Sequence, residues 1–195
     1  TQAKTLFPYT TLFRSGFVMK IVPLFLKADR ASGGLGLTNQ QIGLYYGTFG
    51  AGAFLLGSLL AGYYIARRGL RRTLFTLCCI FNLPFGVYAL LAWFQPSSLW
   101  LVGGGIVVEY FGYGFGFTAY TMFMIMVSQG EYKTVFYAIG TGIMALGMMF
   151  PAMSSGWIQE KLGYIHFYYW ILLTTIPGFM VTALVKIDPE YGKKA

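Results

Sequence analysis

The 195-residue chain is 56% hydrophobic and 19% aromatic, and only 10% of its residues are charged. Soluble globular domains usually contain about 25% charged residues, so this composition excludes an ordinary soluble domain and predicts an integral membrane protein. The net charge of +8 does not indicate a nucleic-acid partner, because the basic residues lie in short segments between long apolar runs and not along one exposed face.

The sequence offers few groups for catalysis. It contains no phosphate-binding loop, no zinc-ligand spacing and no nucleophile elbow, so we predict neither an enzyme nor a bound cofactor or metal ion. The single histidine, His166, lies among aromatic residues near the end of an apolar segment, which favours a role at the membrane interface.

The first apolar segment ends near Ala28 and includes an irregular stretch, TLFPYTTLFRS, at residues 5–15. No period of 2 or 3.6 residues fits this stretch, and it matches in full the in-frame translation of a widely used sequencing-adapter oligonucleotide. We interpret residues 1–15 as a non-native leader. The native sequence would then begin at Gly16, part-way through the first helix.

Five further apolar segments follow, and each reaches the roughly 20 residues that a membrane-spanning helix requires. They cover residues 40–66, 73–94, 98–127, 134–157 and 164–186. The predicted fold class is therefore all-α. We expect a six-helix transmembrane bundle over residues 16–187 and a tail over residues 188–195.

Small residues and prolines recur inside these segments. Gly57 lies four residues after Ala53 and four before Ala61. The pairs Gly43 and Gly47, and Gly112 and Gly116, have the same spacing, which predicts close approach between helices in lipid. Prolines should kink the helices that contain them because each removes a backbone donor. These prolines are Pro23, Pro84, Pro151 and Pro177.

Basic residues are concentrated in alternate connections. The run RRGLRR, at residues 67–72, joins the second and third segments, and strict alternation places Lys133 and the C-terminal tail on the same side. The opposite side holds only Lys27, Arg30 and Lys161. Because cytoplasmic loops carry an excess of lysine and arginine, we predict that RRGLRR and the C-terminus are cytoplasmic.

Two ionisable residues lie deep within the predicted spans. Glu109 is the only acid inside any span, and Lys20 is the only base well inside one. At a rise of about 1.5 Å per residue, Lys20 lies roughly 12 Å and Glu109 roughly 16 Å from the outer boundary. Groups at such depth mostly face a bundle interior or an aqueous cavity. We predict that the two face each other across a cavity, where Glu109 takes up and releases a proton. The alternative is that Lys20 extends to a lipid headgroup and a neighbouring helix satisfies Glu109.

The connection GYYIARRGLRR, at residues 62–72, resembles the cytoplasmic signature of the major facilitator superfamily of transporters. The residues that fit this signature in register are Gly62, Arg67, Gly69, Arg71 and Arg72. Ala66 replaces its aspartate, which weakens any role of this loop as a charge-latched gate. A degenerate copy is typical of the second signature in this superfamily. The resemblance therefore implies that the six spans are helices seven to twelve, the C-terminal half of a carrier built from inverted three-helix repeats.

Residues 33–64 and 137–178 further resemble the AmpG-like permeases of this superfamily. The resemblance implies a substrate site between two six-helix halves near the membrane midplane, lined in part by the seventh and tenth helices. Lys20 falls on the first of these helices and Glu109 on the second. AmpG-like relatives import muropeptides, which are cell-wall sugar-peptide fragments, across the bacterial inner membrane with the proton gradient. Related members carry acetyl-CoA.

Aromatic residues near Glu109 are candidates for stacking on sugar rings. Successive helical residues rotate by about 100°, so Tyr113, Phe117 and Tyr120 share the face of Glu109. We therefore predict proton-linked import of an organic solute, with muropeptides as the leading class. The implied partners are this solute, the lipid bilayer and a missing N-terminal half of the same polypeptide. A carrier for another solute, such as a sugar, peptide or drug, and a six-helix scaffold or enzyme subunit stay open as alternatives.

Overall fold

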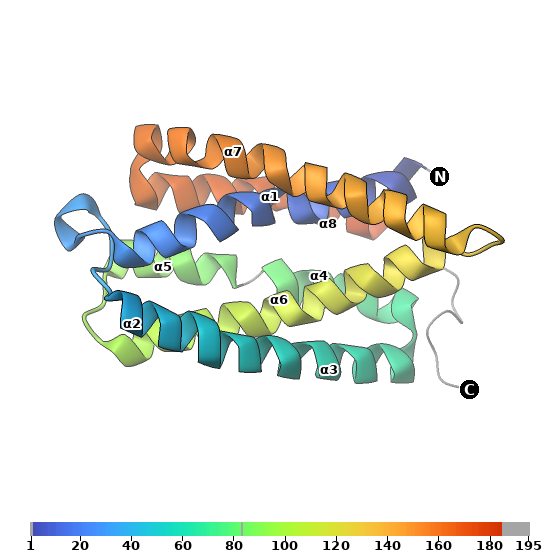
Figure 1. Cartoon of the computed structure of the whole chain (residues 1–195), viewed down its shortest axis with the longest axis horizontal. Helices are drawn as coiled ribbons and strands as arrows, with labels where there is room; N and C mark the ends of the chain where they lie inside the picture. The colour runs from blue at the N-terminus through green and yellow to red at the C-terminus, as the bar shows by residue number, and fades with distance from the viewer. Residues whose placement is uncertain (1, 83, 185–195) are drawn as a thin grey trace.

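The computed structural model describes residues 2–82 and 84–184, with side-chain surroundings from Ser15 onward. All regular secondary structure within these residues is helical, which confirms the predicted fold class. The long helices run roughly parallel or antiparallel to one another (Figure 1).

The elements follow the predicted apolar segments along the chain. They are α1 (Gln2–Lys27), the 3₁₀ helix η1 (Arg30–Ser32), α2 (Asn39–Ile42), the π-helix η2 (Gly43–Phe49), α3 (Gly50–Arg68), α4 (Leu70–Asn82), α5 (Phe85–Phe94), α6 (Leu99–Val127), α7 (Lys133–Thr174) and α8 (Ile176–Leu184).

Three helical stretches of the described chain are long and apolar enough to cross a membrane, judged by length and composition. They are Asn39–Arg68, Leu70–Phe94 and Lys133–Leu184. The helix α6 is 29 residues long and is not among them, because its glycines, its tyrosines and Glu109 lower its mean hydropathy. Helices cover each predicted segment within the described residues, whereas six membrane crossings stay a prediction.

The helix α7 is divided by a reversal of the chain at Gly163. The backbone angles there are φ 69° and ψ 169°, a conformation that glycine adopts at no steric cost. Figure 1 shows the first arm of α7 in orange crossing the molecule and the second arm returning beside it in red. This break separates the fifth predicted segment from the sixth.

The predicted proline kinks have different outcomes. Pro84 precedes α5, where the third segment is interrupted, and Pro177 follows the interruption between α7 and α8. Pro151 lies inside α7 and does not break it. The non-helical backbone angles of α7 occur at Gly163 instead. A proline in these segments therefore marks a break at some positions only.

An extensive helix pairing joins α3 to α6 through small residues on both sides. A Cβ on Gly57 would collide with the carbonyl oxygen of Phe111, and a Cβ on Gly114 would collide with that of Phe54. Gly57 is buried on α3, together with Ala53 and Ala61. The predicted close approach is confirmed along this row. It is wrong at Gly43 and Gly47, where an added Cβ would meet nothing within 4 Å.

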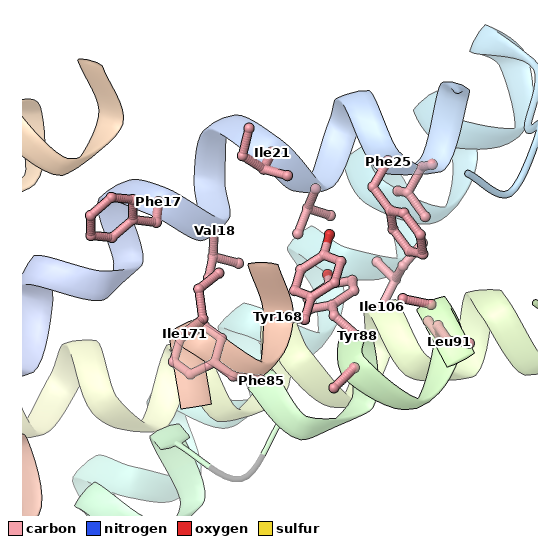
Figure 2. Packing of buried hydrophobic residues seen from close by; sticks show 14 of the residues in the cluster. Phe17, Val18, Ile21, Phe25, Phe85, Tyr88, Leu91, Ile106, Tyr168 and Ile171 are labelled. Carbon is pink, nitrogen blue, oxygen red and sulfur yellow. The ribbon is translucent and has the colours of Figure 1, made fainter. Parts of the chain in front are cut away.

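Two clusters of buried apolar residues fill the bundle. One joins α1, α5, α6 and the second arm of α7, and Figure 2 shows part of it between α1 and α5. The other joins α3, α4 and α6 near the α3–α4 connection. Both α4 and α6 contribute to the two clusters, but α6 also packs against α3, α4, α5 and α7, so it is the central helix of the described bundle.

Charged residues gather at the two ends of the bundle. The end on the right of Figure 1 carries the α3–α4 connection and the start of α7, where Arg67, Arg71 and Lys133 lie. At the opposite end, the guanidinium of Arg30 donates hydrogen bonds to the carbonyl oxygens of Gln95 and Pro96, at 2.8 and 2.9 Å. These bonds tie the first connection to the one between α5 and α6.

Candidate functional site

Glu109 lies near the middle of α6 and is only 8% exposed. Its carboxylate oxygen Oε2 accepts a hydrogen bond of 3.2 Å from the hydroxyl of Tyr88 on α5. Tyr88 is completely buried. An acidic side chain in the interior is thus held by a neutral donor on another helix.

A second buried tyrosine extends this polar centre. The ring of Tyr168, on the second arm of α7, stacks on that of Tyr88 with centroids 5.8 Å apart and planes inclined by 19°. Figure 2 shows the two rings side by side in the packed cluster. The Tyr168 hydroxyl is buried and has no hydrogen-bond partner among the described residues. Of these two stacked tyrosines, Tyr88 therefore has its hydroxyl engaged, whereas the hydroxyl of Tyr168 meets no partner among the described residues.

Aromatic rings border Glu109 on its own helix and on the preceding π-helix. Tyr46 of η2 contacts Tyr110 edge-to-face, with centroids 4.8 Å apart. Further along α6, the ring of Tyr113 packs against that of Phe54, with centroids 5.7 Å apart. π-Helices are rare and frequently occur at functional sites, so η2 adds to the case that this region is functional.

The two ionisable residues predicted to lie deep in the membrane have different surroundings in the structure. Glu109 is buried, whereas Lys20 is exposed on α1. In the part of the chain that the structure describes, no cation lies within ion-pair distance of Glu109. The two helices that carry these residues share little direct contact. That Glu109 and Lys20 face a common cavity stays a prediction.

The three aromatic residues predicted to share the face of Glu109 differ in exposure. Tyr113 is half-buried, and Phe117 is 38% exposed. Tyr120 is only 3% exposed and borders a small internal void beside Phe81. Among these three residues, Tyr113 and Phe117 therefore have ring surface that a solute could reach.

The signature-like connection forms a tight turn. Gly69 has φ 78° and donates its N–H to the carbonyl oxygen of Ile65, so it ends α3 in a conformation that favours glycine. The guanidinium of Arg67 lies 4.6 Å above the ring of Tyr63. Gly62 is half-buried, and Arg71 and Arg72 are exposed. The arginines remain available to solvent or headgroups.

Three tyrosines of this region were not predicted from the sequence: Tyr46, Tyr88 and Tyr168. The sequence does contain a signal for Tyr88, because it stands alone in the apolar run FGVYALLAWF, and a buried tyrosine usually finds a hydrogen-bond partner. The same pattern gives no sign of which acceptor it meets, since Glu109 is on another helix. No group of three or more His, Cys, Asp or Glu residues that could hold a metal ion occurs among the described residues.

Comparison with known proteins points to transporters. An uncharacterized protein of Haemophilus influenzae is 25% identical over 152 residues, which cover 75% of this chain and 36% of that protein. The anhydromuropeptide permease of Escherichia coli K12 is 22% identical over 177 residues, 91% of this chain and 35% of the permease. Putative transporter AmpG 1 of Rickettsia felis is 23% identical over 146 residues, 75% of this chain and 32% of that protein.

No family model matches the chain. The chain spans about a third of the length of the curated relatives described above. Permeases and transporters are not enzymes, and the apolar helices agree with a location in a membrane. The relatives and the helices together support a membrane transporter of the AmpG permease type.

Proposed function

We propose that this chain is the C-terminal six-helix half of a proton-coupled major facilitator carrier that imports muropeptide-like solutes across a bacterial inner membrane. Residues 16–187 form this half, residues 1–15 are a non-native leader and the tail at 188–195 is cytoplasmic. The observation that carries the proposal is the buried carboxyl group of Glu109, held by Tyr88 in a chain related to permeases.

The helix pairings support inverted three-helix repeats. If the first three spans are repeated in the last three, a two-fold rotation exchanges the first span with the fourth, the second with the fifth and the third with the sixth. The contact of α1 with the first arm of α7, where a Cβ on Gly16 would collide with the carbonyl oxygen of Met148, then becomes the extensive pairing of α3 with α6. The contact of α4 with α6 likewise becomes that of α1 with α8, and both are present.

The surroundings of Glu109 support a role in proton coupling. An ionised carboxylate inside a membrane protein is costly unless a cation or several donors compensate it. Glu109 has one neutral donor, Tyr88, and no cation within ion-pair distance among the described residues. We therefore assign the protonated form of Glu109 to this closed arrangement. Opening of the cavity toward water would allow the proton to leave.

The exposed aromatic surface of α6 supports a solute that contains sugar rings. Tyr113 and Phe117 lie with centroids 6.3 Å apart and planes inclined by 29°. Such nearly parallel rings offer faces on which the apolar faces of pyranose rings can pack, while hydroxyls at the edge, such as that of Tyr113, can bond to the solute. Lys20, exposed on α1, is available to a carboxylate of the peptide portion.

The decisive experiment uses the full-length protein that contains this half, reconstituted in vesicles. A labelled anhydromuropeptide should accumulate when an inward proton gradient is applied. Glu109→Gln should abolish accumulation but retain exchange of labelled for unlabelled solute, because exchange requires no net proton movement. Glu160→Gln changes an exposed acid in the same way and should leave accumulation unchanged.

Two results would contradict the proposal. Full gradient-driven accumulation by Glu109→Gln would remove Glu109 from proton coupling. Preference for a simple sugar, a peptide or acetyl-CoA over muropeptides in the same vesicles would replace the solute class. If the full-length protein transported none of these, a scaffold or enzyme subunit would become the better interpretation.

A further inference from the structure

A groove at the basic end of the bundle is separate from the Glu109 site. It has a volume of about 510 Å³ and lies between the last turn of α6 and the first turns of α7. The described residues of its lining combine polar and apolar side chains: Ile125, Ser128, Gln129, Lys133, Thr134 and Tyr137. The transport mechanism proposed above uses none of these residues.

Ser128 is the feature of this groove that indicates a ligand. The residue is only 3% exposed, yet it lines the groove. Its backbone N–H is bonded to the carbonyl oxygen of Met124, but its hydroxyl makes no hydrogen bond to any described residue. Because buried polar groups are normally hydrogen-bonded, the unpaired hydroxyl of a nearly buried residue that borders a groove is a candidate contact for a bound molecule.

The charges around the groove favour an anionic group. Lys133 is the first residue of α7, whose free backbone N–H groups and positive dipole end also attract anions. No described carboxylate lies within ion-pair distance of Lys133. Glu131 is close in sequence and exposed, but it does not line the groove. Thr134 adds a second hydroxyl donor to the lining.

The apolar part of the groove distinguishes between sources of such an anion. Ile125 lines the groove and is 46% exposed, and Phe136, on the adjoining turn of α7, is 56% exposed. A free phosphate ion gains nothing from apolar walls, whereas a phospholipid places acyl chains beside its phosphate. A groove at the end of membrane-spanning helices also lies at the depth of the headgroups.

We propose that this groove binds the phosphate of an anionic phospholipid, with Lys133, Ser128 and Thr134 as its donors and Ile125 beside the acyl chain. The site rests on the placement of the chain in a membrane and is independent of which solute is carried. A headgroup bound here would hold the short connection between α6 and α7 at the membrane surface.

The test measures binding of radiolabelled phosphatidylglycerol and phosphatidylcholine to the purified full-length protein in nonionic detergent. We expect phosphatidylglycerol to bind about tenfold more tightly, as a charge-assisted contact predicts. Lys133→Gln and Ser128→Ala should each weaken its binding by about three- to tenfold, and Lys133→Arg should retain it. Matched controls are Lys161→Gln, at the opposite end, and Ser154→Ala, whose hydroxyl bonds to its own helix.

Equal affinity for the two lipids, or unchanged binding in Lys133→Gln and Ser128→Ala, would overturn the site. Displacement of the lipid by millimolar inorganic phosphate or glycerol phosphate would overturn the lipid assignment, because it would show that the groove takes a soluble anion. Lys133 is on the surface, so its variants should fold; circular dichroism would verify this. Normal uptake by a variant that no longer binds lipid would leave the proposed transport function intact.

Discussion

Glu109 and Lys20 occupy similar predicted depths in the bilayer but opposite surroundings in the folded chain. Glu109 is enclosed by the bundle and accepts a hydrogen bond from Tyr88. Lys20, at a comparable distance from the end of its own helix, is exposed. Depth along a helix axis is therefore one coordinate of a side chain's environment, and the angle around the axis is the other.

The difference in exposure between Glu109 and Lys20 follows from how α6 and α1 pack. The helix α6 is central and contacts helices on several sides, so most directions around it lead into protein. The helix α1 packs mainly against α7 and α8, which leaves part of its circumference uncovered. The uncovered face of α1 is where the proposed N-terminal half of the carrier, or lipid, would lie.

The largest expected effect on stability comes from reversing the charge at Glu109, and the comparison is with the reversal at Lys20. Glu109→Lys puts a buried ammonium group beside Tyr88 with no carboxylate to compensate it. We expect destabilisation by about 4 kcal/mol or more, with loss of folded protein from the membrane fraction. Lys20→Glu, a charge reversal at an exposed position, should change the apparent melting temperature in detergent little. Glu109→Gln is the control for volume and should fold.

Equal tolerance of Glu109→Lys and Lys20→Glu would show that the carboxyl group of Glu109 is not enclosed in the folded protein. The contrast between the two residues would then be lost. The result can be read from expression level and thermal unfolding alone, so it does not depend on an identified solute.

A second experiment tests whether α6 has a closed face and an open face. A Cβ at Gly114 would collide with the carbonyl oxygen of Phe54, whereas a Cβ at Gly104 would meet nothing within 4 Å. Gly114→Ala should therefore separate α3 from α6 and cost about 2 to 3 kcal/mol. Gly104→Ala should be neutral or slightly stabilising, since alanine favours helix. The measurement is the apparent melting temperature of each variant in the same detergent.

Comparable losses of stability in the two glycine variants would mean that the α3–α6 contact does not have the geometry described. Comparable tolerance would lead to the same conclusion. Because both residues lie on α6 and undergo the same substitution, differences in helix propensity cancel in the comparison.

The sequence predicted the helical segments and the row of small residues well, because both are local signals. A long apolar run must satisfy its backbone within a helix, and Ala53, Gly57 and Ala61 share one face by their spacing alone. The reversal at Gly163 also fell between two predicted segments. Division of the third segment at Pro84 agreed with the expected effect of proline, whereas the helical geometry at Pro151 required knowledge of its surroundings.

The candidate site was only partly predictable, because its contacts join residues far apart in the sequence. Glu109 could be identified as an acid inside an apolar segment. Its donor Tyr88 could not, because it stands 21 positions earlier in the chain, across a turn whose geometry sets which helix faces meet. The exposure of Lys20 was equally hidden, since it depends on where α7 and α8 pack around α1.

The smallest expected effect distinguishes the two stacked tyrosines beside Glu109. Tyr88→Phe removes the hydroxyl that donates to Glu109 and leaves a buried carboxyl group without that partner, which should cost about 1 to 2 kcal/mol. Tyr168→Phe removes a buried hydroxyl that has no partner among the described residues, so stability should be unchanged or slightly higher. Both substitutions keep the stacked rings, and thermal unfolding in detergent compares them directly. Greater loss in Tyr168→Phe than in Tyr88→Phe would show that the Glu109 carboxyl group draws its stabilisation from a contact other than Tyr88, and the contrast with the exposed Lys20 would then need a different physical cause.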